Sequence, residues 1–227
     1  MELSARASDI LHLLLNSFWP ILKAGLAFTI PLTLITFALG LILGFIIAII
    51  RLFKIKVLKD IAYLYVWVIR GTPLLVQLFI LFYGLPSIGL ILDPFTAAVI
   101  GFTLNMGAYN SEIIRAAIDS IHKGQWEAAY SLGMTKAQAM RRIIIPQAMR
   151  VSIPPLSNSF ISLVKDTSLA ATITVGELFR KGQEIAATNY EPFWIYIEVA
   201  VIYLIFCTIL NYFQSLMEKR TSRHLEQ

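Results

Sequence analysis

Residues 127–146 read EAAYSLGMTKAQAMRRIIIP, a polar segment between long apolar runs. The residues from Gln125 to Leu132 are mostly good helix formers, and Gly133 suits the left-handed residue that ends a helix. Thr135 can cap a following helix, and Gln138 three residues later would complete a capping box. The segment therefore predicts two short helices with a sharp break between them, a shape suited to docking a partner protein at a membrane surface.

The composition points to a membrane protein. The chain has 227 residues, of which 57% are hydrophobic and only 15% charged, which is too apolar for an ordinary soluble domain. Runs of about 20 apolar residues indicate membrane-spanning helices. The net charge of +5 lies mainly in short links between these runs, so it argues for membrane orientation rather than for nucleic acid as a partner.

We expect one all-α, multi-pass domain over residues 1–227. The predicted spans cover about 25–50, 61–83, 95–118, 145–163 and 193–217, with a loop over 119–144. Gly71 and Pro73 should break the second span, and the Pro154-Pro155 pair should bend the fourth. Ahead of the first span, apolar residues on one helical face predict a short helix on the membrane surface; they are Ile10, Leu13, Leu14 and Phe18.

Lysine and arginine placement predicts the orientation. The first-to-second link, the loop over 119–144 and the tail are rich in these residues, for example Lys54, Arg142 and Arg223. The links on the opposite side of the membrane hold fewer lysines and arginines. We therefore expect the N-terminus outside, the C-terminus in the cytoplasm and the loop over 119–144 on the cytoplasmic side.

No catalytic site can be recognised. The chain lacks the phosphate-binding Gly-x-x-x-x-Gly-Lys-Ser/Thr loop, and its three histidines are scattered without metal-ligand spacing. No Ser-His-acid arrangement can be inferred either. We expect no enzymatic activity, no metal and no cofactor held by this chain.

Polar side chains inside the predicted spans are costly in hydrocarbon, so they should face protein or a water-filled path. A translocation path and interhelical hydrogen bonding both remain possible explanations for the single residues. The adjacent charges Lys165 and Asp166 favour a path, because neighbours on a helix do not face each other. Glu112 and Arg115 should pair, and Gly40 with Gly44 could mark a helix contact within or between subunits.

The loop resembles the EAA loop of permease subunits of ATP-binding cassette importers. The match covers Glu-Ala-Ala at 127–129, Gly133, Ile143 and Pro146, with Ile145 where the pattern has Leu. The resemblance implies a coupling helix that sits in a groove of an ATPase subunit, which binds the ATP. The implied coupling residues are Gly124, Glu127, Ala128, Ala129 and Gly133.

The resemblance extends over nearly the whole chain to polar amino acid permeases of the type I importer group. It is carried by Arg70-Gly71-Thr72-Pro73-Leu74, Gly107-Ala108-Tyr109 and Lys165-Asp166-Thr167-Ser168-Leu169. It implies a bacterial cytoplasmic (inner) membrane protein that pairs with a second permease copy or a close relative. An extracytoplasmic amino acid-binding protein and the ATPase would complete the transporter.

The segment over 154–164 is most similar to cystine permeases of this group. Arginine permeases of the group carry an acid where Ser159 stands, so the serine disfavours a substrate with a cationic side chain. It does not by itself select cystine over glutamine or other neutral polar amino acids. L-cystine is the expected substrate, with glutamine or arginine as alternatives and an ion-coupled secondary transporter as a further one. The expected substrate contacts are Thr72, Gln77, Asn105, Ser159 and Asp166.

Overall fold

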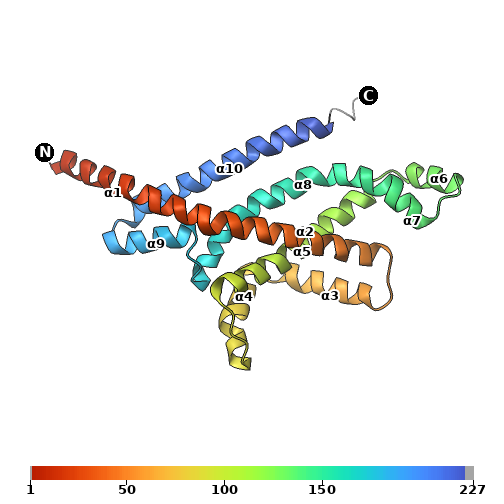
Figure 1. The fold of residues 1–227 in the computed structure, drawn as a ribbon, viewed down its shortest axis with the longest axis horizontal. Coiled ribbons are helices and arrows are strands. Elements are labelled where there is room, and N and C mark those ends of the chain that lie inside the picture. The colour runs from red at the N-terminus through yellow and green to blue at the C-terminus, as the bar shows by residue number, and fades with distance from the viewer. Residues whose placement is uncertain (1, 223–227) are drawn as a thin grey trace. The chain divides into compact units, whose positions relative to one another are not determined.

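The structure is a computed structural model that describes the backbone of residues 2–222 and the side chains of residues 6–216. Within this part of the chain every regular element is helical (Figure 1), as expected for an all-α protein. The basic tail residue Arg223 lies outside the described residues. The α-helices are α1 (Glu2–Ala24), α2 (Ile30–Leu52), α3 (Leu58–Gly71), α4 (Leu74–Phe79), α5 (Pro94–Asp119), α6 (Lys123–Ser131), α7 (Lys136–Ala139), α8 (Ile145–Asp166), α9 (Leu178–Asn189) and α10 (Pro192–Ser222).

Shorter π and 3-10 segments join several of these helices. They are η1 (Gly25–Thr29), η2 (Ile80–Gly84), η3 (Leu85–Ile88), η4 (Met140–Ile144) and η5 (Thr167–Ile173). The chain forms two compact units, which we describe separately. Unit 1 comprises Met1–Thr36, Leu74–Gly101 and Ile161–Tyr212, and unit 2 comprises Phe37–Pro73, Phe102–Phe160 and Phe213–Gln227.

The first helical run differs from the expected separate surface helix and span. One unbroken helix covers Arg6–Leu52, because the π-helical turn η1 joins α1 to α2. In this turn the Ile30 N–H donates to the Gly25 carbonyl, just before Pro31, whose nitrogen cannot donate to the helix. Gly25 also permits close packing, since a Cβ there would lie 2.9 Å from Leu178. Where we expected one helix to end and the next to begin, the structure has a wider turn within a continuous helix.

Local chemistry explains how two other helices begin or end. The predicted break at Gly71 and Pro73 is confirmed, since α3 ends at Gly71 and Thr72 is extended with φ −121° and ψ 146°. At the start of α5, Asp93 accepts from the Thr96 N–H at 3.0 Å and Pro94 occupies the first helical position. α8 remains helical through Pro154 and Pro155.

Length and composition identify only some of these helices as spans. Within residues 2–222, two helices are long and apolar enough to cross a membrane, Arg6–Leu52 and Pro192–Leu216. The bent pair of helices Leu58–Gly71 and Leu74–Ile88 would be a third span if the two cross the membrane together. α5 and α8 contain many polar residues, including Asn105, Asn110 and Asn158. Helices that border a polar path need such residues, which lowers their overall hydropathy.

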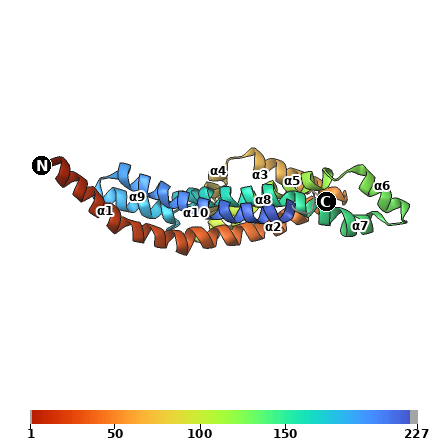
Figure 2. The ribbon, with the colours of Figure 1, turned by 90° about the horizontal axis from the view of Figure 1, so that it is seen from above.

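Unit 1 has a core in which α9 runs alongside α1 (Figure 2) and α10 packs against both. Its buried side chains include Ile21, Leu178, Ile195 and Ile202. Within this core the Ser17 hydroxyl donates to the buried carboxylate of Glu198. Unit 1 is thus held together by apolar packing with a few buried polar pairs.

Unit 2 is built on a close crossing of α2 and α5. A Cβ at Gly40 would lie 2.5 Å from Met106, and one at Gly44 would lie 2.9 Å from Asn110. Small residues let helix backbones approach in this way. The glycine pair therefore marks a contact within the chain, one of the two alternatives that the sequence left open.

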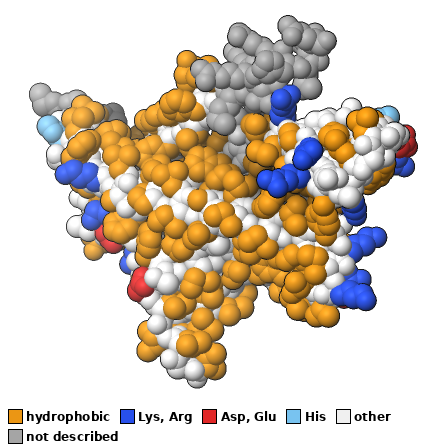
Figure 3. All heavy atoms as spheres, turned by 45° about the vertical axis from the view of Figure 1, so that its right-hand side comes forward, with side chains coloured by type: hydrophobic (Ala, Val, Ile, Leu, Met, Phe, Trp, Pro, Cys, Tyr) orange, Lys and Arg blue, Asp and Glu red, His pale blue; other side chains and the backbone are white. Residues whose placement is uncertain are grey.

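The outer surface is strongly apolar. Hydrophobic side chains cover much of the face in Figure 3, and Lys and Arg side chains gather toward its margins. Trp67 is 74% exposed and Leu204 is 65% exposed. A soluble protein rarely exposes large apolar patches, whereas a lipid-facing helix requires them, so the surface fits a membrane environment.

Candidate coupling and translocation sites

The turn between α6 and α7 has the conformation that the sequence predicted. Gly133 has φ +76°, its N–H donates to the Tyr130 carbonyl at 2.9 Å, and the Met134 N–H donates to the Ala129 carbonyl at 3.1 Å. These two bonds make a Schellman motif, which satisfies carbonyls at the helix end. The break is therefore set by hydrogen bonds that need a left-handed residue at position 133.

The second short helix begins with the predicted capping box. The Gln138 N–H donates to the Thr135 hydroxyl at 3.3 Å, and the Thr135 N–H donates to Gln138 Oε1 at 2.8 Å. The cap of α6 was not predicted: His122 Nδ1 accepts from the Gly124 N–H at 3.1 Å. Histidine is not among the usual capping residues, so its role could not be seen in the sequence.

The α6–α7 segment, residues 123–139, is fixed to the rest of unit 2 on one side only. Ala129 is fully buried, while Glu127 and Ala128 are exposed and Leu132 is 76% exposed. Met140 and Ile144, which follow the segment, are buried in a cluster with α2 and α5 residues. Among the expected coupling residues, Ala129 is thus a packing residue, and the free surface comes from its neighbours.

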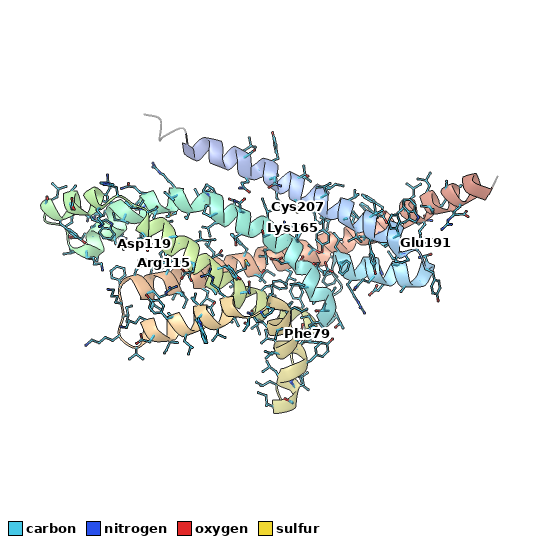
Figure 4. The ribbon with its side chains drawn as sticks, turned by 180° about the vertical axis from the view of Figure 1, so that it is seen from behind. Phe79, Arg115, Asp119, Lys165, Glu191 and Cys207 are labelled. Carbon is cyan, nitrogen blue, oxygen red and sulfur yellow. The ribbon has the colours of Figure 1, made fainter. Side chains whose placement is uncertain are left out.

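A carboxylate surrounded by arginines lies close to this cluster. Glu112 of α5 forms ion pairs with Arg51 of α2, with Arg70 of α3 at 3.9 Å and with Arg115 at 3.0 Å. Arg115 also pairs with Asp119 at 2.6 Å, and Figure 4 shows these two side chains next to each other on α5. The predicted pairing of Glu112 with Arg115 is confirmed.

Aromatic rings complete this ion cluster. The Arg51 guanidinium lies 4.4 Å from the ring centre of Tyr63, and that of Arg70 lies 5.2 Å from the ring centre of Tyr109. Arg51 is almost fully buried. Cation–π contacts and a shared carboxylate offset the cost of burying its charge. The cluster ties α2, α3 and α5 together.

Three of the expected substrate residues belong to unit 2. Thr72 is exposed, and its hydroxyl donates to the Val68 carbonyl at 2.9 Å. Asn105 is buried in α5. The Ser159 hydroxyl donates to Asn110 Oδ1 at 3.2 Å, so Asn110 holds the serine in place. Within this unit Ser159, where we expected a substrate contact, is thus part of a polar contact between α5 and α8.

The other two expected substrate residues belong to unit 1. Gln77 is half-buried in α4, and Asp166 is half-buried at the end of α8. Lys165 is exposed and lies near Cys207 of α10 (Figure 4). Neither Lys165 nor Asp166 forms an ion pair with any residue between 6 and 216. Within the same range no group of three or more His, Cys, Asp or Glu side chains could hold a metal ion.

Comparisons with known proteins agree on one family. A family model described as "Binding-protein-dependent transport system inner membrane component" matches residues 40–223. The L-cystine transport system permease protein TcyB of Bacillus subtilis (strain 168) is 56% identical over 211 residues, which cover 92% of this chain and 90% of that protein. The glutamine transport system permease protein GlnP of Escherichia coli (strain K12) is 40% identical over 210 residues, 90% of this chain and 96% of that one.

Solved structures share the fold. A chain of an amino acid ABC transporter crystallised with histidines has a TM-score of 0.86 and 40% identity, covering 91% of this chain and 96% of its own. The methionine transporter MetNI in an inward-facing form has a TM-score of 0.68 at 18% identity, covering 94% of this chain and 98% of its own, which shows the fold alone. The chain therefore belongs to the binding-protein-dependent transport system inner membrane components, the permease family of ATP-binding cassette importers.

Proposed function

We propose that this chain is the permease subunit of an ATP-driven importer for L-cystine in the cytoplasmic membrane of a bacterium. The observation that carries the proposal is the 56% identity to an L-cystine permease over 92% of the chain. The hydroxyl of Ser159 and the amide of Asn110 are neutral groups that support a polar substrate with no net positive charge. Glutamine is the second candidate, because a glutamine permease is 40% identical over 90% of the chain.

In the proposed topology the chain crosses the membrane five times, with the N-terminus outside and the C-terminus in the cytoplasm. Two copies, or one copy and a close relative, would frame the path. An external binding protein would deliver the substrate, and Thr72, Gln77, Asn105, Ser159 and Asp166 would contact it. ATP would be bound by the partner ATPase, since this chain has no phosphate-binding loop.

The α6–α7 segment would transmit the ATPase movement. The partner would contact the exposed Glu127, Ala128 and Leu132. The buried hydrophobic cluster that includes Met140 and Ile144 joins the segment to α2 and α5. A displacement of α6 would therefore move these helices as a body. Because a ligand shifts an equilibrium only by its differential affinity, ATP and substrate must each favour one conformation of the permease.

The test is uptake of labelled L-cystine by vesicles that hold this chain, its ATPase and its binding protein. We expect ATP-dependent uptake that excess unlabelled cystine blocks and that glutamine and arginine do not. Vesicles with an ATPase that binds but does not hydrolyse ATP are the control. Uptake that persists with that ATPase, and that stops when the proton and sodium gradients are collapsed, would indicate an ion-coupled transporter instead. Uptake that glutamine blocks would keep the importer and change the substrate.

A further inference from the structure

Unit 2 contains an apolar groove between α2, α5 and α8 that the described residues leave open. Its volume is about 410 Å³, and Ile42, Phe45, Ile46, Met149, Ser152 and Ile153 are among its lining residues. Among the described residues that line it, Ser152 alone is polar, and its hydroxyl donates to the Met149 carbonyl at 2.9 Å. The groove thus offers no free polar group and suits a hydrocarbon ligand.

The side chains along the groove remain exposed. Ile42 is 60% exposed, Ile46 is 48% exposed and Met149 is 61% exposed. Burying such side chains stabilises a complex by about 25 cal/mol for each Å² removed from water. In a bilayer, however, only an occupant that fits the groove better than bulk lipid gains from binding, through closer packing and through polar contacts.

The groove has the length of one membrane leaflet. On α8 its lining extends from Ile145 to Leu156, which at 1.5 Å per residue corresponds to about 16 Å. The hydrocarbon core of a bilayer is about 30 Å thick, so one leaflet contributes about half of that. An acyl chain that enters at the end near Ile145 would fill the groove to its other end.

Positive side chains stand at the Ile145 end. Arg141 and Arg142 precede Ile145 by one helical turn, and both are exposed. Neither of them pairs with an acidic residue in the part of the chain whose side chains are described. An apolar groove that ends at unpaired cations matches an amphiphile with an anionic head.

We propose that this groove binds one acyl chain of an anionic phospholipid whose phosphate is held by Arg141 and Arg142. Arginine forms bidentate, charge-assisted hydrogen bonds with phosphate, and basic sites at the cytoplasmic side of membrane helices attract anionic head groups. The proposal rests on the proposed membrane orientation, which places these arginines in the cytoplasm. The two arginines favour this occupant over a second copy of this chain, for which the apolar walls alone would suffice.

The site would also bear on coupling. Arg141 and Arg142 lie in η4, which joins the α6–α7 segment to α8. Ile145 and Ala148 line the groove and also pack in the cluster that holds Met140 and Ile144. The lipid would thus contact the same packed residues that transmit the movement of the ATPase.

The experiment is native mass spectrometry of the full chain, purified with its ATPase in detergent and titrated with phosphatidylglycerol or phosphatidylcholine. We expect phosphatidylglycerol to bind more tightly. Arg141→Gln combined with Arg142→Gln should weaken it by about tenfold or more, as loss of charge-assisted bonds implies. Met149→Trp, which fills the groove, should weaken both lipids. The controls are Arg150→Gln and Val151→Trp, which change exposed residues of α8 that do not line the groove.

Two outcomes would overturn the proposal. One is equal binding of the two lipids by the wild type with no effect of the double arginine change. The other is a Met149→Trp variant that binds phosphatidylglycerol normally but no longer pairs with a second permease copy, which would make the groove an interface between copies. Since the readout is lipid binding, a failure of cystine uptake would not be mistaken for a failure of this site.

Discussion

At the scale of single residues, Gly133 allows the turn within the α6–α7 segment through its backbone conformation. No atom lies within 4 Å of the position where its Cβ would be, and its φ is +76°. A β-branched residue in this left-handed conformation costs about 1–3 kcal/mol. We predict that Gly133→Val reorients α7 and lowers ATP-dependent uptake, measured in vesicles, while ATP hydrolysis continues. Gly133→Asn is the matched control, since asparagine tolerates this conformation; full activity of the valine variant would contradict the explanation.

Ser159 offers a second test, of substrate charge. Its hydroxyl donates to Asn110 Oδ1 at 3.2 Å, and we propose that it faces the substrate. An aspartate there would offer a charge-assisted bond to a cationic side chain, worth about 1.5–3 kcal/mol. We predict that Ser159→Asp improves competition by arginine against labelled cystine by about tenfold. Ser159→Asn, of similar size but neutral, should leave arginine a poor competitor. Equal effects of the two changes would argue against a charge contact here.

The environment of Glu177, which lies in the link before α9, leads us to predict how the stability of the fold depends on pH. Its fully buried carboxylate accepts from the Arg180 N–H at 2.7 Å and from the Tyr203 hydroxyl at 2.8 Å. Burial raises the pKa of Glu177 above its ordinary value of 4.5, although these hydrogen bonds oppose the rise. An acid with a raised pKa stabilises the fold at pH values below its unfolded pKa, and this contribution is lost as the pH rises through the folded pKa.

The expected result is a melting temperature that falls as the pH rises from about 5 to about 8 in the wild type. Glu177→Gln cannot ionise, so its melting temperature should change less over the same range. Glu184→Gln is the control, since Glu184 is exposed on α9, the helix that Glu177 caps. Parallel curves for wild type and Glu177→Gln would show that Glu177 does not titrate differently in the folded state.

At the scale of elements, the crossing of α2 and α5 depends on small residues. A Cβ at Gly44 would lie 3.0 Å from the Ser111 nitrogen and 3.1 Å from the Gly107 carbonyl oxygen, whereas one at Gly71 would meet nothing within 4 Å. Backbone cannot move aside as a side chain can. We predict that Gly44→Ala lowers the free energy of unfolding by about 1–3 kcal/mol, measured as a lower melting temperature in detergent. Gly71→Ala makes the same chemical change and should have little effect on the melting temperature. A similar fall in both variants would show that the close crossing of α2 and α5 is not the cause.

The elements that sequence reasoning identified are those whose signals are local. Gly133, Thr135 and Gln138 lie within six residues of one another, and each acts through its own backbone or a neighbour's. The helix α9 was not predicted, because its cap is Glu177, which is not a usual capping residue. The continuity of α1 and α2 was also missed. It involves packing of Gly25 against Leu178 and Phe206, which are distant in sequence.

The same distinction applies to the candidate sites. The pairing of Glu112 with Arg115 follows from their spacing on one helix and was predicted. The contacts of Glu112 with Arg51 and Arg70 require α2 and α3 to meet α5, which spacing along one helix cannot reveal. The groove proposed to bind lipid is lined by three helices, so sequence patterns along one helix could not reveal it either.

At the scale of the whole molecule, the proposed path and coupling surface have a function only if the chain crosses the membrane as we propose. The single cysteine makes this testable. Cys207→Ala gives a chain without cysteine, to which one cysteine can be added at an exposed site. Ala137→Cys would mark the α6–α7 segment and Thr188→Cys would mark α9, since both residues are exposed.

With five spans and the N-terminus outside, a membrane-impermeant thiol reagent should label Thr188→Cys in intact cells. It should label Ala137→Cys only after the membrane is opened. The parent chain without cysteine controls for labelling elsewhere, and cystine uptake in each variant shows that it still assembles. In the chain, α8 leads from the α6–α7 segment to the link that holds α9. An odd number of crossings between the two labelled positions must therefore place them on opposite sides. Labelling of both in intact cells, or of neither, would mean that α8 does not cross alone and that the five-span topology is wrong.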